Sequence, residues 1–199
     1  MKRAAFGVQM HSGWGVLVAV AGDANSVEIL DRRRIVTADP EMPGAIQPYH
    51  FAAGLALPDQ EKHLAHCAEV SSRLAAKAMA VVVKELAGRH YRIVGAAVLL
   101  ASGRTLPPLA KILAAHPLIH TAEGEFFRHA ASQACANLHI PVTAIRMREL
   151  DERANAAFGN AASQVEDNVA KLGSSIGPPW TKDHKTAALA ALLVLVRRR

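Results

Sequence analysis

The sequence predicts an α/β domain in which a mixed β-sheet carries helices on both faces. Two continuous apolar runs, residues 91–101 and 141–147, have the length and composition of strands that are buried on both sides. Helical patterns separate and follow these runs, and two valine-containing strand patterns precede them. The order strands, helix, strand, helices, strand, helices is typical of a three-layer α/β architecture.

The amino-terminal strands are expected to form a β-hairpin. Residues 4–20 are apolar and valine-rich, with glycines inside the run, and residues 27–37 mix apolar positions with charges. The polar segment 22–26, GDANS, suits the turn between them. One strand should therefore be more buried than the other. Residues 46–57 predict either a short third strand or one helical turn.

A long helix is expected over residues 59–87, with Asp59 as its N-cap and Gly88 just after its end. Thr121 is predicted to cap a later helix, and Glu123 and Glu125 then lie in its first turn, where they favour the helix dipole. Because His120 is adjacent, a metal-binding role for these two glutamates stays open. The shorter helices are expected over residues 107–115, 121–138, 149–158, 161–172 and 182–196.

Composition indicates one ordered globular domain spanning residues 1–199, since this length can bury a substantial core. The apolar fraction is 51%, while aromatic residues make up only 5%, so helices should pack closely on the sheet. Cys67 and Cys135 lie in apolar helical patterns and are expected to be reduced thiols of a cytoplasmic protein. The apolar run 186–196 is too short to span a bilayer, so no membrane association is expected.

The formal net charge is +6 and the sequence pI is near 9.7, which favours polyanionic partners such as DNA or RNA. Much of the excess charge lies in Arg32-Arg33-Arg34 and in the terminal trio 197–199. Both clusters are able to contact phosphates, and both are equally compatible with a solvated surface.

Two segments carry a family resemblance. Residues 7–16, GVQMHSGWGV, are similar to the opening strand and glycine turn of the RNase H-like nucleases, and residues 182–192, KDHKTAALAAL, are similar to their closing helix. The resemblance is strongest to RuvC-type Holliday-junction resolvases. It implies an RNase H-like three-layer fold over most of the chain and phosphodiester hydrolysis assisted by two divalent metals, Mg²⁺ or Mn²⁺. It also implies a homodimer, for which the helix 59–87 is the candidate interface.

The chain departs from this family pattern at its acidic residues. Gln9, Met10 and His11 occupy the neighbourhood of the acid that the family carries on its first strand, and residues 94–102 contain no acid. Asp183 is retained, whereas Thr186 stands where a second acid of the last helix is placed. Because Mg²⁺ prefers hard oxygen ligands, we predict a degenerate metal site. The expected protein is a pseudo-nuclease, a non-catalytic module associated with nucleic acid or protein.

Candidate site residues follow from the motifs and the charge. Asp183, His184 and His11 form the candidate catalytic and metal-binding group, which could hold one transition metal if the first strand and the last helix converge. Trp14 is a candidate for stacking on a base. The nucleic-acid candidates are therefore Arg32, Arg33, Arg34, Trp14 and Arg104.

Two other functions remain open from the sequence. An active metal-dependent nuclease of the RuvC type would need relocated ligands, drawn from Asp183, His184 and His11 with Glu123 or Asp23. A small-molecule or anion binder would use the turn 102–105, which follows a buried strand and precedes a helix. In that turn backbone N–H groups and Arg104 could hold a phosphate.

Overall fold

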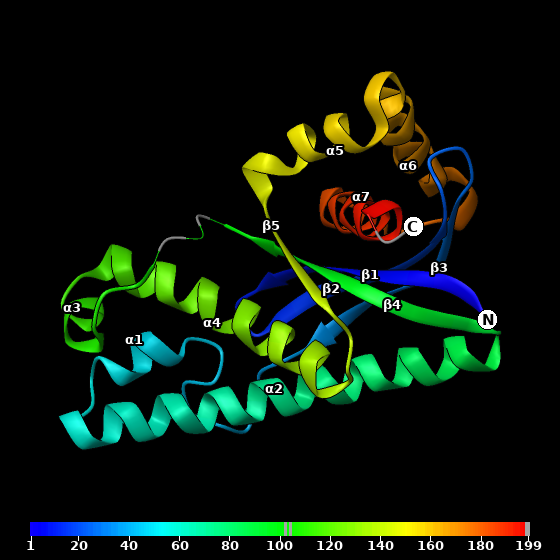
Figure 1. The fold of residues 1–199 in the computed structure, drawn as a ribbon. Helices are drawn as coiled ribbons and strands as arrows, with labels where there is room; N and C mark the ends of the chain where they lie inside the picture. The colour runs from blue at the N-terminus through cyan, green and yellow to red at the C-terminus, as the bar shows by residue number, and fades with distance from the viewer. Residues whose placement is uncertain (102, 104, 198–199) are drawn as a thin grey trace.

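The computed structural model describes residues 1–101, 103 and 105–197, and it is a three-layer α/β domain (Figure 1). Its central sheet has the strand order β3-β2-β1-β4-β5. The antiparallel part comprises β1 (Lys2–His11), β2 (Trp14–Gly22) and β3 (Val27–Val36). Strands β4 (Tyr91–Leu100) and β5 (Val142–Arg146) continue from β1 in parallel. The predicted mixed sheet with an amino-terminal hairpin is confirmed.

The amino-terminal region contains one more turn than the sequence pattern indicated. The segment predicted as a single strand is broken at residues 12–13, so β1 and β2 pair directly with His11 opposite Trp14. Gly13 has a φ of +77°, which glycine adopts without the strain that a side chain would add. The strand pattern alone missed this turn because apolar residues continue on both sides of it, whereas the family resemblance had indicated a glycine turn within residues 7–16. Its effect is to bring His11 next to Trp14.

One face of the sheet is covered by helices from the first two thirds of the chain (Figure 1). Helices α2 (Leu57–Gly88) and α4 (His116–Asn137) pack on the strands, while the short helix α1 (Pro48–Ala52) packs against both of them and α3 (Leu109–Leu113) packs against α4. Cys67 of α2 and Cys135 of α4 are buried free thiols, as predicted. The segment 46–57 contains helix α1, the second of its two predicted alternatives.

Two of these helices begin earlier than predicted. Helix α2 starts after Ala56, and Asp59 lies in its first turn without capping it. Helix α4 starts after Ala115, and Thr121 is inside it, where its hydroxyl donates to the Pro117 carbonyl at 3.0 Å. In both helices a proline occupies the first turn, where its missing N–H costs nothing.

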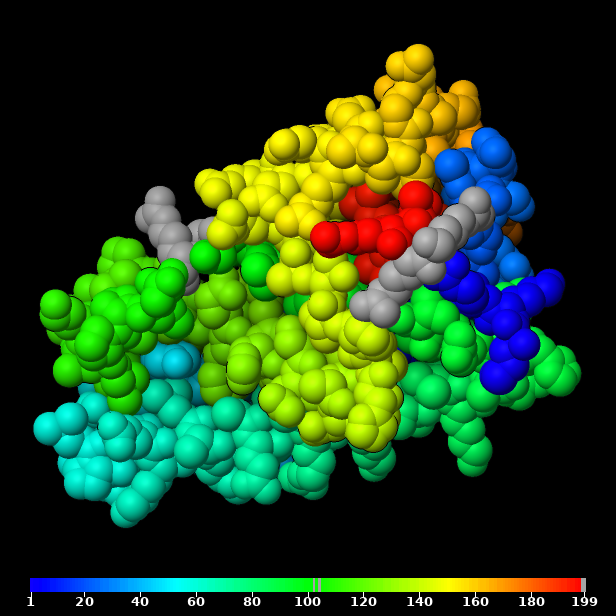
Figure 2. All heavy atoms as spheres, in the orientation of Figure 1, coloured from blue at the N-terminus to red at the C-terminus, as the bar shows by residue number. Residues whose placement is uncertain are grey.

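The opposite face is covered by α5 (Leu150–Phe158), α6 (Ala162–Ile176) and α7 (Lys182–Arg197). Short 3₁₀ turns, Met147–Glu149 and Gly159–Ala161, precede α5 and α6. Figure 2 shows the carboxyl-terminal end of α7, in red, reaching the surface beneath α5. None of the helices in the described ranges is long and apolar enough to cross a membrane.

Helix α7 lies unusually close to the centre of the sheet. A Cβ atom built on Gly7 of β1 would be 1.8 Å from the backbone oxygen of Ala187. Glycine on the strand and alanines on the helix therefore permit a backbone-to-backbone contact that larger side chains would prevent. This contact fixes the first turn of α7, and with it Asp183, against the carboxyl end of β1.

Candidate functional site

The first strand and the last helix meet at a contact between a histidine and an aspartate. His11 ends β1, Asp183 lies in the first turn of α7, and His11 Nε2 is 2.9 Å from Asp183 Oδ2. Side chains alternate along a strand, so Gln9 and His11 point to the same face as Gly7, toward α7. The side chains of His11 and Asp183 are 36% and 31% exposed, so solvent reaches both.

An aromatic stack extends from this His11–Asp183 contact across the sheet. The rings of His11 and Trp14 are stacked with their centroids 4.3 Å apart and an interplanar angle of 18°. The guanidinium carbon of Arg34 lies 3.9 Å from the Trp14 ring, and Arg34 is exposed on β3. A cation, two rings and a carboxylate thus form one continuous row, which we call the Arg34–Asp183 row.

The residues at this junction do not fit the two-metal site that the family resemblance implies. The only carboxylate of the Arg34–Asp183 row is paired with His11, and the neighbouring Gln9 offers a neutral oxygen. That oxygen, Gln9 Oε1, is buried without a hydrogen-bond partner. Among the described residues, one group of three or more His, Cys, Asp or Glu side chains has ligand atoms close enough to share a metal ion. That group lies elsewhere in the fold and includes neither His11 nor Asp183.

His184 does not join His11 and Asp183, although the sequence placed all three in one group. Its Nδ1 is 2.8 Å from Thr181 Oγ1 and accepts a hydrogen bond from the Thr181 backbone N–H at 3.3 Å. Its ring lies beside Trp180, and the residue is only 6% exposed. Burial lowers the pKa of His184, and the positive charge of Arg32 lowers it further, while Asp183 acts in the opposite direction.

This buried histidine predicts a pH dependence of stability. Because the unfolded chain binds a proton at His184 more readily than the folded protein, the free energy of unfolding should decrease as pH falls below about 6.5. Urea unfolding from pH 8 to pH 5 measures this, and His184→Gln should show a shallower decrease. Near pH 8 the free energies of unfolding of the two proteins should change with pH in parallel, because His184 is unprotonated there in both the folded and the unfolded state. If the two free energies stayed parallel down to pH 5, the prediction would be wrong.

The arginine trio is divided between the two faces of the sheet. The Arg32 guanidinium donates to the carbonyls of Ile176 and Gly177, each at 2.7 Å, in the connection between α6 and α7. Arg33 points to the other face, where it pairs with Asp31 and with Glu85 of α2.

The bond to Asp31 is the largest cause of the raised pKa of Arg33. Of the predicted nucleic-acid residues on this strand, Arg34 is the exposed one, and it lies over Trp14. Arg104 lies outside the described residues.

A cavity of about 1020 Å³ lies between α2 and α4, bordered by Leu100 and Leu106 on either side of the turn proposed for anion binding. On its wall, the Ser72 hydroxyl and Glu125 Oε1 are buried without a hydrogen-bond partner. Residues 102 and 104 of that turn are outside the described part of the chain.

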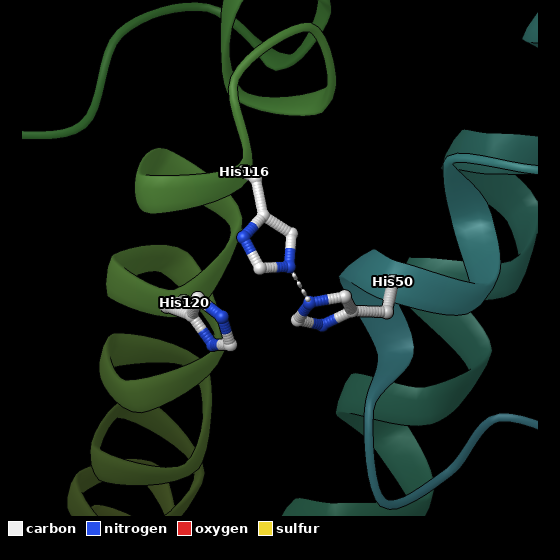
Figure 3. A group of neighbouring side chains, drawn as sticks. All are labelled: His50, His116 and His120. Carbon is white, nitrogen blue, oxygen red and sulfur yellow. Dashed lines mark hydrogen bonds between the residues drawn. The ribbon is translucent and has the colours of Figure 1, made fainter.

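Sequence reasoning missed the group of histidines formed by His50, His116 and His120 (Figure 3). A signal was present, because His116 and His120 are four residues apart and share a helix face. The prediction began this helix at Thr121, so neither histidine was placed on it. His50 is distant in sequence, and only the packing of α1 on α4 brings it to the pair.

Comparison with solved structures finds a full-length likeness. One is Thermus thermophilus RuvC in complex with a Holliday junction substrate, with a TM-score of 0.54, 14% identity, and coverage of 99% of this chain and 95% of that chain. A second T. thermophilus RuvC structure gives a TM-score of 0.54 and 13% identity, covering 98% and 94%. No protein-family model and no curated protein matches the sequence. At these identities the likeness establishes the fold.

Proposed function

We propose that this chain, which has an RNase H-like fold of the RuvC type, is a non-catalytic module that binds nucleic acid. The observation that carries the proposal is the pairing of Asp183 with His11. The carboxylate that the resemblance places in the nuclease site is here in hydrogen-bond contact with an imidazole. On the same face of β1 as His11, Gln9 places a neutral carboxamide where the resemblance expects the acid of the first strand.

The chemistry of this pairing argues against two-metal hydrolysis. Two divalent cations close together need several anionic oxygens to offset their mutual repulsion, and Mg²⁺ gives up its water reluctantly. A single carboxylate that already contacts an imidazole supplies little of that charge. A carboxamide oxygen carries no net charge, so Gln9 cannot replace a bridging carboxylate. The residues at this junction therefore support no hydrolytic step.

Charge and exposure support nucleic acid as the partner. The chain has a net charge of +6, and the exposed Arg34 lies over the ring of Trp14, whose ring also stacks on His11. The arginine is suited to a phosphate, whereas the Trp14 ring serves to hold Arg34 in place. The structurally similar T. thermophilus RuvC is described in complex with a Holliday junction substrate, which makes junction DNA the first ligand to test.

We expect the purified protein to bind junction DNA with strong salt dependence and without metal-dependent cleavage. Binding to junction, duplex and single-stranded DNA should be measured across a salt series, with and without Mn²⁺, while the same samples are assayed for cleavage. Asp183→Asn should leave the cleavage assay unchanged, since the proposed module does not hydrolyse DNA. Affinity should fall linearly on a log–log plot against salt.

The other outcomes distinguish the alternatives. Metal-dependent cleavage that is lost in Asp183→Asn would contradict the proposal and establish an active nuclease with relocated ligands. No binding at low salt would exclude nucleic acid and favour a protein partner or a small molecule in the cavity between α2 and α4.

The cytoplasmic location and the homodimer stay predictions. In support of α2 as the interface, the apolar side chains of Leu57 and Val81 are 72% and 44% exposed on this helix.

A further inference from the structure

We propose that His50, His116 and His120 form a binding site for a divalent transition-metal ion, with Zn²⁺ as the preferred ion. The three imidazoles come from α1 and from the first turns of α4 and converge between the two helices (Figure 3). Their ligand nitrogens all lie within 4.8 Å of one another. The inference does not depend on the proposed function, because this group lies on the α2 and α4 side of the sheet, away from α7.

The spacing of two of the nitrogens matches a tetrahedral metal site. His50 Nε2 and His116 Nε2 are 3.3 Å apart. Two imidazole nitrogens at about 2.0–2.1 Å from one tetrahedral Zn²⁺ are separated by about 3.3 Å. The His120 ring has its centroid 4.4 Å from that of His116 and 4.8 Å from that of His50. His120 is exposed, so its side chain can rotate to complete the group without moving the helix.

A buried carboxylate prepares His50 for this role. Glu123 Oε1 is 2.9 Å from His50 Nδ1 and accepts a second hydrogen bond from the His50 backbone N–H at 3.1 Å. The proton of the ring is thereby held on Nδ1, which leaves the lone pair of Nε2 directed at the other histidines. Metal-binding histidines commonly donate their second nitrogen to a carboxylate in this way.

Glu123 also places a carboxylate next to the three histidines, none of which is acidic. The Glu123 side chain is only 4% exposed, and it contacts the ring of His50 at 2.9 Å. A divalent cation held by the three imidazoles would therefore lie one imidazole away from a buried carboxylate. His116, His120 and Glu123 lie along one face of α4, at spacings of four and three residues, so a single helix presents two ligands and the supporting carboxylate.

The ligand chemistry selects the ion. Imidazole suits Zn²⁺ and neighbouring transition metals, whereas Mg²⁺ and Ca²⁺ require oxygen ligands. Three protein ligands leave one tetrahedral position open, and the exposure of His116 and His120 lets water occupy it. Bound metal would join α1, in the segment between β3 and α2, to the amino-terminal end of α4.

The test is titration of the metal-free full-length protein with Co²⁺ and with Zn²⁺. We expect one Co²⁺ per chain with the visible absorption of a tetrahedral ion, displaced by Zn²⁺ but not by Mg²⁺, and a Zn²⁺-dependent rise in Tm. Glu123→Gln should weaken binding by about 10–100-fold, as for other supporting carboxylates. His116→Gln and His120→Gln should weaken it more.

Two matched variants serve as controls. His129→Gln changes an exposed histidine of the same helix, and His66→Gln changes one on α2 near His63 and Cys67. Both should retain wild-type stoichiometry, affinity and Tm shift, and circular dichroism checks that every variant is folded. Wild-type binding in folded His116→Gln and His120→Gln, loss of binding in His66→Gln, or no tetrahedral Co²⁺ spectrum would each overturn the proposal.

Discussion

Gly7→Ala is expected to lower the free energy of unfolding by about 3 kcal/mol or more, at the upper end of the cost of overpacking. The added Cβ would lie 1.8 Å from the backbone oxygen of Ala187 and 2.5 Å from its carbonyl carbon. Neither atom belongs to a side chain that could rotate away. Relief requires α7 to move from the sheet, and its residues from 187 to 195 are all buried.

Urea unfolding monitored by circular dichroism measures this change, and Gly88→Ala is the matched control. A Cβ at Gly88, the last residue of α2, would meet nothing within 4 Å. Alanine is also the better helix former, so the control should equal or exceed the wild-type stability by up to about 1 kcal/mol. Equal stabilities for Gly7→Ala and the wild type would show that α7 is not held against β1 as the structure has it.

The helices and strands that could be predicted from the sequence are those with strong local signals. The apolar run 91–101 is β4, and the small-residue helix predicted over 182–196 is α7 within one residue. Each has a length and a periodicity that need no knowledge of distant contacts. The turn at residues 12–13 carried a weaker signal in the strand pattern, because apolar residues lie on both sides of it and pairing with a neighbouring strand determines where β1 ends.

The candidate site divides in the same way. The approach of His11 to Asp183 was expected from the family resemblance, since their separation of 172 residues gives no local signal. His184 was grouped with Asp183 because the two are adjacent, yet successive helical residues point about 100° apart. That rotation directs His184 to Thr181 and Trp180. The arginine trio follows the strand rule that neighbours alternate between faces, which separates Arg33 from Arg32 and Arg34.

Arg32→Gln is expected to lower stability and Arg34→Gln to weaken DNA binding, although the two residues lie on one face of one strand. Arg32 holds carbonyls at the end of α6, so its replacement should lower the free energy of unfolding by about 2 kcal/mol, within the range for hydrogen bonds to charged groups. The affinity of the Arg32→Gln variant for junction DNA should equal that of the wild type. Both terminal nitrogens of the Arg32 guanidinium already donate to backbone carbonyls within the protein.

Arg34→Gln should instead leave stability within about 1 kcal/mol, because an exposed arginine over an aromatic ring contributes little. It should weaken DNA binding and reduce the magnitude of the salt slope by about 1, as loss of one phosphate contact does. Arg92→Gln is the control, since Arg92 is exposed on β4 at the opposite end of the sheet. It should alter neither quantity.

Unfolding curves and salt titrations of the same three variants decide between a structural and a binding role for each arginine. If Arg32→Gln kept wild-type stability and lost DNA affinity, its contacts with the α6–α7 connection would be incidental and the strand would bind DNA through both exposed and internal arginines. If Arg34→Gln and Arg92→Gln weakened binding equally, the attraction would be general to the basic chain. The row from Arg34 to Asp183 would then have no special part in recognition.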